Sequence, residues 1–141
     1  MVAYYNQEID FRFRGKKAHS TWLKAVAEEE GRRLGPVSVI FCSDEKILEV
    51  NRRYLGHDYY TDIITFDYSD AEMISGDLFI SIDTVKSNAE FYSVPFDDEI
   101  DRVMVHGILH LIGYDDHTEE ESAEMRFKEN YYLSKRALFL K

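Results

Sequence analysis

The stretch HGILHLIGYDDH, residues 106–117, is the part of this 141-residue chain that decides its fold and its chemistry. Its two histidines, His106 and His110, are four residues apart, so on a helix they share one face with Cβ atoms about 5–6 Å apart. Both rings can therefore reach one metal ion, which in zinc sites lies about 2.0–2.1 Å from each ligand nitrogen. The spacing predicts a helix that carries two ligands of one metal ion.

A third ligand is expected from the turn that follows this helix. Gly113 can adopt a positive φ, end the helix and turn the chain back, so that Asp115, Asp116 or His117 faces the same ion. Three protein ligands and an open fourth position are typical of catalytic zinc. The two-histidine spacing alone is weak evidence for a metal site, because one histidine can be a hydrogen-bonded core residue and the other a surface residue. The glycine and the cluster after it favour the metal site.

The flanking sequence places this stretch on a central, buried helix. Apolar residues at helical spacing run from Ile100 to Leu111, after Pro95 and three acidic residues that suit a positive helix N-terminus. Thr118 and Glu121 have the spacing of a capping box and predict the start of a final helix.

Upstream, segments rich in β-branched residues alternate with segments of helical periodicity. This alternation predicts an α/β fold of the mixed α+β kind, with a small mixed sheet of about four strands flanked by helices and the metal-binding helix in the centre. Strands are expected near residues 2–5, 9–13, 36–41, 62–67 and 76–82, and helices at 17–30, after the N-cap Ser43 and after the cap Asp83.

Length and composition predict a single domain over residues 1–141, with 45% hydrophobic and 31% charged residues. With the predicted metal site, this domain is expected to be a metal-dependent hydrolase. Cys42, the only cysteine, lies in an apolar run and is expected to be a buried thiol. No leader-like start or membrane-length apolar run is present, so a cytoplasmic protein is expected.

The formal net charge of −10 argues against a nucleic-acid partner, because a polyanion needs a basic surface to bind. Exposed charges are screened beyond about 8 Å at physiological salt, so a local basic patch can still bind phosphate. Arg52 and Arg53 form one candidate patch, and two solvated surface charges are the alternative interpretation.

The pattern His-Gly-x-Leu-His-Leu-x-Gly-Tyr-Asp at 106–115 resembles the signature of the YbeY family, bacterial endoribonucleases and ribosomal-RNA maturation factors. The segments Asn51-Arg52-Arg53-Tyr54, Asp58, residues 61–66 and Gly76-Asp77 are similar to the family's other segments in order and spacing. The resemblance implies one zinc ion and a single-strand-specific endoribonuclease. Its implied role is the maturation of the 3′ end of small-subunit ribosomal RNA and ribosome quality control.

Two positions depart from the family pattern. The family's third metal ligand is usually a histidine six residues after the second, where this chain has Asp116. We expect Asp116 to be the ligand, since a carboxylate oxygen binds zinc at nearly the same distance, and His117 is the alternative. Leu55 stands where the family commonly has an arginine thought to hold RNA, and Arg52 or Arg53 could substitute for it.

The sequence is compatible with two other functions. A zinc hydrolase acting on peptides or small amides is disfavoured, because Gly107 stands where the H-E-x-x-H motif has its glutamate base. A ribosome-assembly factor that is not an enzyme could hold a structural zinc ion, with Asp116 and His117 both closing the site.

The proton-transfer residues cannot be assigned from the sequence. Asp62, Asp67 and Asp77 are available, but each is equally well explained as a turn or capping carboxylate. His19 and His57 are expected at the surface, without a role.

Overall fold

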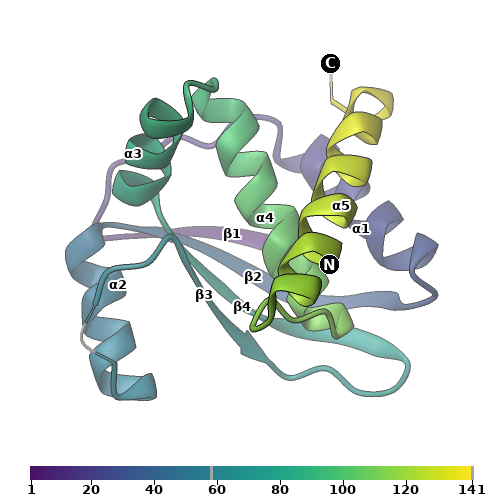
Figure 1. Ribbon diagram of the computed structural model, residues 1–141, viewed down its shortest axis with the longest axis horizontal. Coiled ribbons are helices and arrows are strands. Elements are labelled where there is room, and N and C mark those ends of the chain that lie inside the picture. The colour runs from purple at the N-terminus through teal and green to yellow at the C-terminus, as the bar shows by residue number, and fades with distance from the viewer. Residues whose placement is uncertain (58, 141) are drawn as a thin grey trace.

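The computed structural model describes residues 1–57 and 59–140, and it contains one four-stranded mixed sheet with helices on both faces (Figure 1). The strand order is β1-β2-β4-β3, in which β1, β2 and β4 are parallel and β3 is antiparallel to β4. The strands are β1 (Val2–Gln7), β2 (Arg33–Cys42), β3 (Ile63–Asp67) and β4 (Met73–Ser81). The helices are α1 (Lys16–Glu29), α2 (Asp44–Val50), α3 (Ile82–Tyr92), α4 (Phe96–Ile112) and α5 (Glu119–Lys135), with short helical turns η1 (Asn51–Leu55) and η2 (Arg136–Leu138). The predicted fold class is confirmed.

The two faces of the sheet are buried against different helices. Val37, Val39 and Phe41 of β2 belong to the large core that α1 and α4 cover. Cys42, the last residue of β2, belongs to a smaller cluster with Ile47 of α2. This alternation follows from the strand geometry, in which successive side chains point to opposite faces.

Helix α4 is the centre of the larger layer. Figure 1 shows it crossing the sheet, and it packs on β3 and β4 as well as on α1, α3 and α5. Gly107 permits this close approach, because a Cβ atom there would lie 2.8 Å from Cδ1 of Ile63 and 3.0 Å from Cδ1 of Leu78. Packing against the sheet at Gly107 therefore fixes the position of the end of α4 that carries the two histidines.

The ends of the helices are largely as the sequence predicts. Gly113 has φ 126° and caps α4, and Thr118 and Glu121 form both hydrogen bonds of a capping box at the start of α5. Ser43 accepts a hydrogen bond from Lys46 N at the start of α2.

Three expectations for the N-terminal half and for α3 were wrong. Residues 9–13 form a connector and not a strand, and its aromatic rings, including Phe11, pack on Phe41. Ser81, not Asp83, caps α3, because its hydroxyl accepts from Thr84 N. His19 is buried against Asp101 of α4 and is not a surface residue.

Asp58, one of the residues that carry the family resemblance, lies outside the described part of the chain. Among the helices that are described, none combines the length and the apolar composition needed to cross a membrane.

Candidate metal centre

The last two turns of α4 and the turn after it bring three side chains together. His106 Nε2 lies 3.0 Å from His110 Nε2, and Asp116 Oδ2 lies 3.3 Å from the first nitrogen and 3.6 Å from the second. Gly113 ends the helix with both its own N–H and that of Tyr114 bonded to Leu109 O, and the chain then returns toward the histidines. All of the predicted primary ligands therefore converge.

The spacing of these atoms fits a single metal ion. Two ligands of a tetrahedral zinc ion, each about 2.0–2.1 Å from the metal, lie roughly 3.3 Å apart. The three side-chain atoms all lie within 4.8 Å of one another. Two imidazole nitrogens and one carboxylate oxygen are also the donor types that zinc and similar divalent ions accept. His106, His110 and Asp116 could therefore hold one ion and leave a position open.

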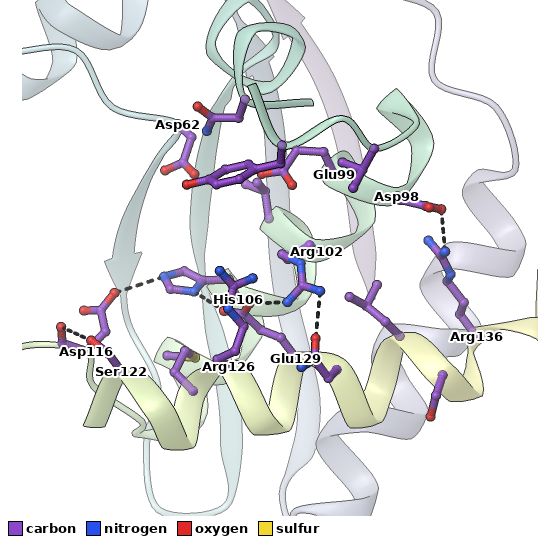
Figure 2. A pocket seen from close by; sticks show the side chains of 18 residues that line it. Asp62, Asp98, Glu99, Arg102, His106, Asp116, Ser122, Arg126, Glu129 and Arg136 are labelled. Atoms are coloured by element: carbon purple, nitrogen blue, oxygen red, sulfur yellow. Dashed lines mark hydrogen bonds and ion pairs between the residues drawn. The ribbon is translucent and has the colours of Figure 1, made fainter. Parts of the chain in front are cut away.

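Glu129 of α5 orients the first histidine. Its Oε2 lies 2.6 Å from His106 Nδ1, so that ring nitrogen carries a proton and Nε2 is left for a ligand role. Its Oε1 accepts from Arg102 at 2.8 Å. Burial by itself would raise the pKa of Glu129, but the hydrogen bonds from His106 and Arg102 outweigh it and hold this pKa below its usual value. Figure 2 shows His106 between Asp116 and Glu129.

The two imidazoles have different electrostatic surroundings. Burial would lower the pKa of His106, but Glu129 and the nearby carboxylates outweigh burial and raise it. Burial and the neighbouring His106 lower the pKa of His110, which favours its neutral form. A neutral imidazole is the form that binds metal.

The candidate centre lies where two clefts meet. The larger, of about 670 Å³, runs between α4 and α5 toward the end of α3. The smaller, of about 550 Å³, is lined by η1, the following loop and β3. Asp62, His106 and Asp116 line both clefts. An extended ligand could therefore occupy both sides of the three side chains.

Asp62 and Glu99 also face the larger cleft, as Figure 2 shows. Burial raises the pKa of Asp62, and the positive charge of a protonated His106 only partly offsets it. Burial and the neighbouring Asp62 raise the pKa of Glu99 on α4. Asp62 is thus distinguished from the other two predicted proton-transfer candidates. Asp67 accepts from Ser69 N in a turn, and Asp77 accepts from the Tyr68 hydroxyl.

The structure separates the remaining candidates from the centre. The His117 side chain is 80% exposed, and its Nε2 lies 3.9 Å from Asp115 Oδ1. Arg52 and Arg53 are exposed on η1 and line neither cleft, and Arg53 pairs with Glu49 at 3.9 Å. Leu55, in contrast, lines the smaller cleft.

Sequence reasoning missed Glu129, Arg102 and Glu99. Glu129 is 23 residues from His106 in the chain, and no local spacing connects the two. The sequence signal that could have singled out Glu129 is its helical spacing, which places this acid on the same face as the apolar residues Met125 and Tyr132, both buried.

The chain is similar to known proteins over nearly its whole length. The family profile described as Endoribonuclease YbeY matches residues 2–137. A protein of Parabacteroides distasonis named Endoribonuclease YbeY is 55% identical over 133 residues, 94% of either chain. One of the same name from Phocaeicola vulgatus is 52% identical over 134 residues, 95% of this chain and 97% of that one. A Thermotoga maritima protein solved in solution superposes with a TM-score of 0.69 at 28% identity, covering 96% of this chain and 89% of that chain.

Proposed function

This chain belongs to the YbeY family of endoribonucleases, and we propose that it cuts single-stranded RNA during 3′-end maturation of small-subunit ribosomal RNA. The proposal includes a role in ribosome quality control, with the small ribosomal subunit as partner in the cytoplasm. It also includes one zinc ion, held by His106, His110 and Asp116. The observation that carries it is the convergence of these three ligand atoms where two open clefts meet.

The metal would supply Lewis acidity to a phosphodiester and neutralise negative charge that develops on it. The protein's own contribution is to hold the ligand side chains in position. Glu129 fixes the orientation of His106, and Gly107 lets α4 rest on the sheet. The three ligand groups are therefore arranged before substrate arrives, which reduces the reorganisation needed during the reaction.

With a net charge of −10, RNA binding at this site requires a local positive group. Three arginines, Arg102, Arg126 and Arg136, line the larger cleft. Arg102 and Arg136 are bonded to acids, whereas the side chain of Arg126 is exposed on α5. A guanidinium in this position can bind a phosphate oxygen of a strand that lies between α4 and α5.

The two alternatives fit the site less well. Peptide hydrolysis of the H-E-x-x-H type would need a glutamate at Gly107, and even a Cβ atom there would meet Ile63 and Leu78. A closed structural site would need a fourth ligand, for which His117 was the candidate, and His117 points to solvent beside Asp115. The described residues thus offer three ligands, as catalytic zinc sites do.

The test is RNA cleavage by protein purified free of contaminating nuclease. Zinc-loaded wild type is expected to cut a small-subunit RNA fragment with an unprocessed 3′ extension, and His110→Ala prepared in parallel is expected to lose this activity. Equal cleavage by both proteins, or by neither, would contradict the proposal. A peptide-library digest addresses the alternative substrate, and we expect no peptide cleavage.

A further inference from the structure

Two aromatic side chains stack on one another beside the candidate metal centre. The rings of His57 and Tyr59 have centroids 5.2 Å apart and an interplanar angle of 19°, and Tyr59 Oη lies 3.1 Å from His57 Nδ1. Both line the smaller cleft, which His106 and His110 also line. The side chain of Tyr59 is 54% exposed. A wide aromatic surface is therefore accessible in the same cleft as the ligand histidines.

Asn51, a buried residue with 1% exposure, holds this pair in place from inside the fold. The His57 N–H donates to the Asn51 carbonyl oxygen at 3.1 Å. The Asn51 side-chain amide donates to the Tyr59 carbonyl oxygen at 2.9 Å. The backbone N–H of His57 and the backbone carbonyl of Tyr59 are thus both held by Asn51 without any ligand, which lowers the ordering cost of binding to these rings.

The chemistry of the cleft favours an uncharged planar group over a phosphate. Four carboxylates line it, from Asp62, Asp67, Asp115 and Asp116. Leu55 adds a partly exposed apolar side chain where the family resemblance leads one to expect arginine. Carboxylates repel the RNA backbone, whereas a nucleobase carries no charge and stacks on aromatic rings of any protein.

We propose that the stacked pair His57–Tyr59 binds one unpaired nucleobase of the RNA substrate, within a short distance of the phosphodiester to be cut. This inference rests on the proposed endoribonuclease function and explains how the cleft at the metal centre would select unpaired RNA. A base within a duplex is stacked on both faces by its neighbours and held by pairing along its edge, so it cannot present a face to Tyr59. The pair would therefore contribute to selection of single strands on the β3 side of the metal centre.

The binding test uses a single-stranded RNA that contains the fluorescent base 2-aminopurine at successive positions. Stopped-flow mixing with zinc-loaded protein records quenching by an aromatic ring before cleavage proceeds. Loss of one base–aromatic stack typically weakens binding by roughly 5- to 150-fold. We expect Tyr59→Ala to raise the Kd within this range and to lose the quenching at one position, while Tyr59→Phe retains both.

The matched control is Tyr5→Ala, because Tyr5 is equally exposed, at 53%, but lies on strand β1 and lines neither cleft at the metal centre. This variant should bind RNA as the wild type does. Thermal unfolding of all the variants verifies that Tyr59→Ala folds, which is expected because the Asn51 hydrogen bond goes to the backbone carbonyl of Tyr59 and Tyr59 is exposed.

A second measurement separates this inference from the proposed function. An abasic nucleotide is moved along the RNA, and kcat and KM for cleavage are recorded for wild type and Tyr59→Ala. We expect one abasic position to raise KM for the wild type and to have no added effect in the variant. Equal kcat and KM for both proteins on intact RNA would overturn the stacking site and leave the nuclease function standing. Position-specific quenching without any cleavage would support the stacking site and overturn the nuclease function.

Discussion

Glu129 Oε2 lies 2.6 Å from Nδ1 of His106, the ring nitrogen that does not face His110. A buried carboxylate on α5 thus fixes the orientation of a candidate ligand on α4. Such a partner raises the basicity of the ligand and holds its ring in one orientation.

Substitution of this partner is expected to weaken metal binding. Glu129→Gln keeps the shape of the side chain but removes its charge, and changes of this kind typically cost about 10–100-fold in metal affinity. Competition with a chromogenic chelator measures the zinc Kd. Glu124→Gln, on the exposed side of the same helix, should leave the affinity unchanged. An unaltered Kd in Glu129→Gln would show that the contact has no part in metal binding.

Substitutions at the adjacent residues Asp116 and His117 test which of them is the third metal ligand. Asp116→Ala should lower zinc affinity by more than the roughly 10–100-fold that loss of an orienting residue costs. His117→Ala should bind zinc as the wild type does, because its ring points to solvent. Asp116→His should retain zinc, since imidazole binds at nearly the same distance as carboxylate. Loss of zinc in His117→Ala would instead identify that residue as the ligand.

Gly107→Ala is expected to destabilise the fold. A helix gains up to about 1 kcal/mol from this exchange, but the new Cβ would lie 2.8 Å from Cδ1 of Ile63, and overpacking costs about 1–3 kcal/mol. We expect the free energy of unfolding, measured in urea, to fall by up to about 2 kcal/mol. Ile63→Val removes the carbon atom in question, so the double variant should lose less than the sum of the single ones. Strict additivity would mean that the two residues do not compete for space.

His19 is expected to make a pH-dependent contribution to the stability of the fold. Its Nε2 lies 2.8 Å from Asp101 Oδ1, and its Nδ1 donates to the Gly15 carbonyl at 2.8 Å. Burial would lower the pKa of His19, but the bond and charge of Asp101, the Gly15 carbonyl and the charge of Asp97 outweigh it and raise the pKa above 6.5. Arg136 also bonds Asp101, at 2.7 Å, and Arg12 and Arg14 line the same cavity as His19 and Asp101.

Because the pKa of His19 is higher in the folded than in the unfolded chain, the charged ring stabilises the fold fully below pH 6.5. This contribution is lost as the pH rises through the folded pKa. His19→Gln should therefore destabilise the fold by about 1–3 kcal/mol at pH 5.5, and the difference from wild type should shrink toward alkaline pH. Chemical unfolding across pH 5.5–9 measures it. A difference that is constant, or that grows with pH, would contradict this account.

The helix–turn part of the site was predictable from sequence because its determinants are local. His106 and His110 share a face by helical periodicity, and a glycine of φ 126° turns the chain back as Gly113 was expected to. The choice of Asp116 over His117 needed the family resemblance, since spacing alone allows either residue.

Other features depend on contacts between segments distant in sequence. Glu129 reaches His106 only because α5 packs on α4. His19 appeared to be a surface residue, because nothing near it in the chain indicates that Asp101 lies against it. Residues 9–13 have the pattern of a strand, but no strand edge pairs with them in the described chain, and Phe11 and Phe13 pack as a connector instead.

We propose that His106, His110 and Asp116 hold one divalent ion on which RNA cleavage depends. The most direct measurement is the cleavage rate of metal-free protein as zinc is added back. We expect no cleavage without metal and a rise in rate that saturates at one ion per chain, with no rise in His110→Ala. Cleavage by rigorously metal-free wild type at the full rate would contradict it.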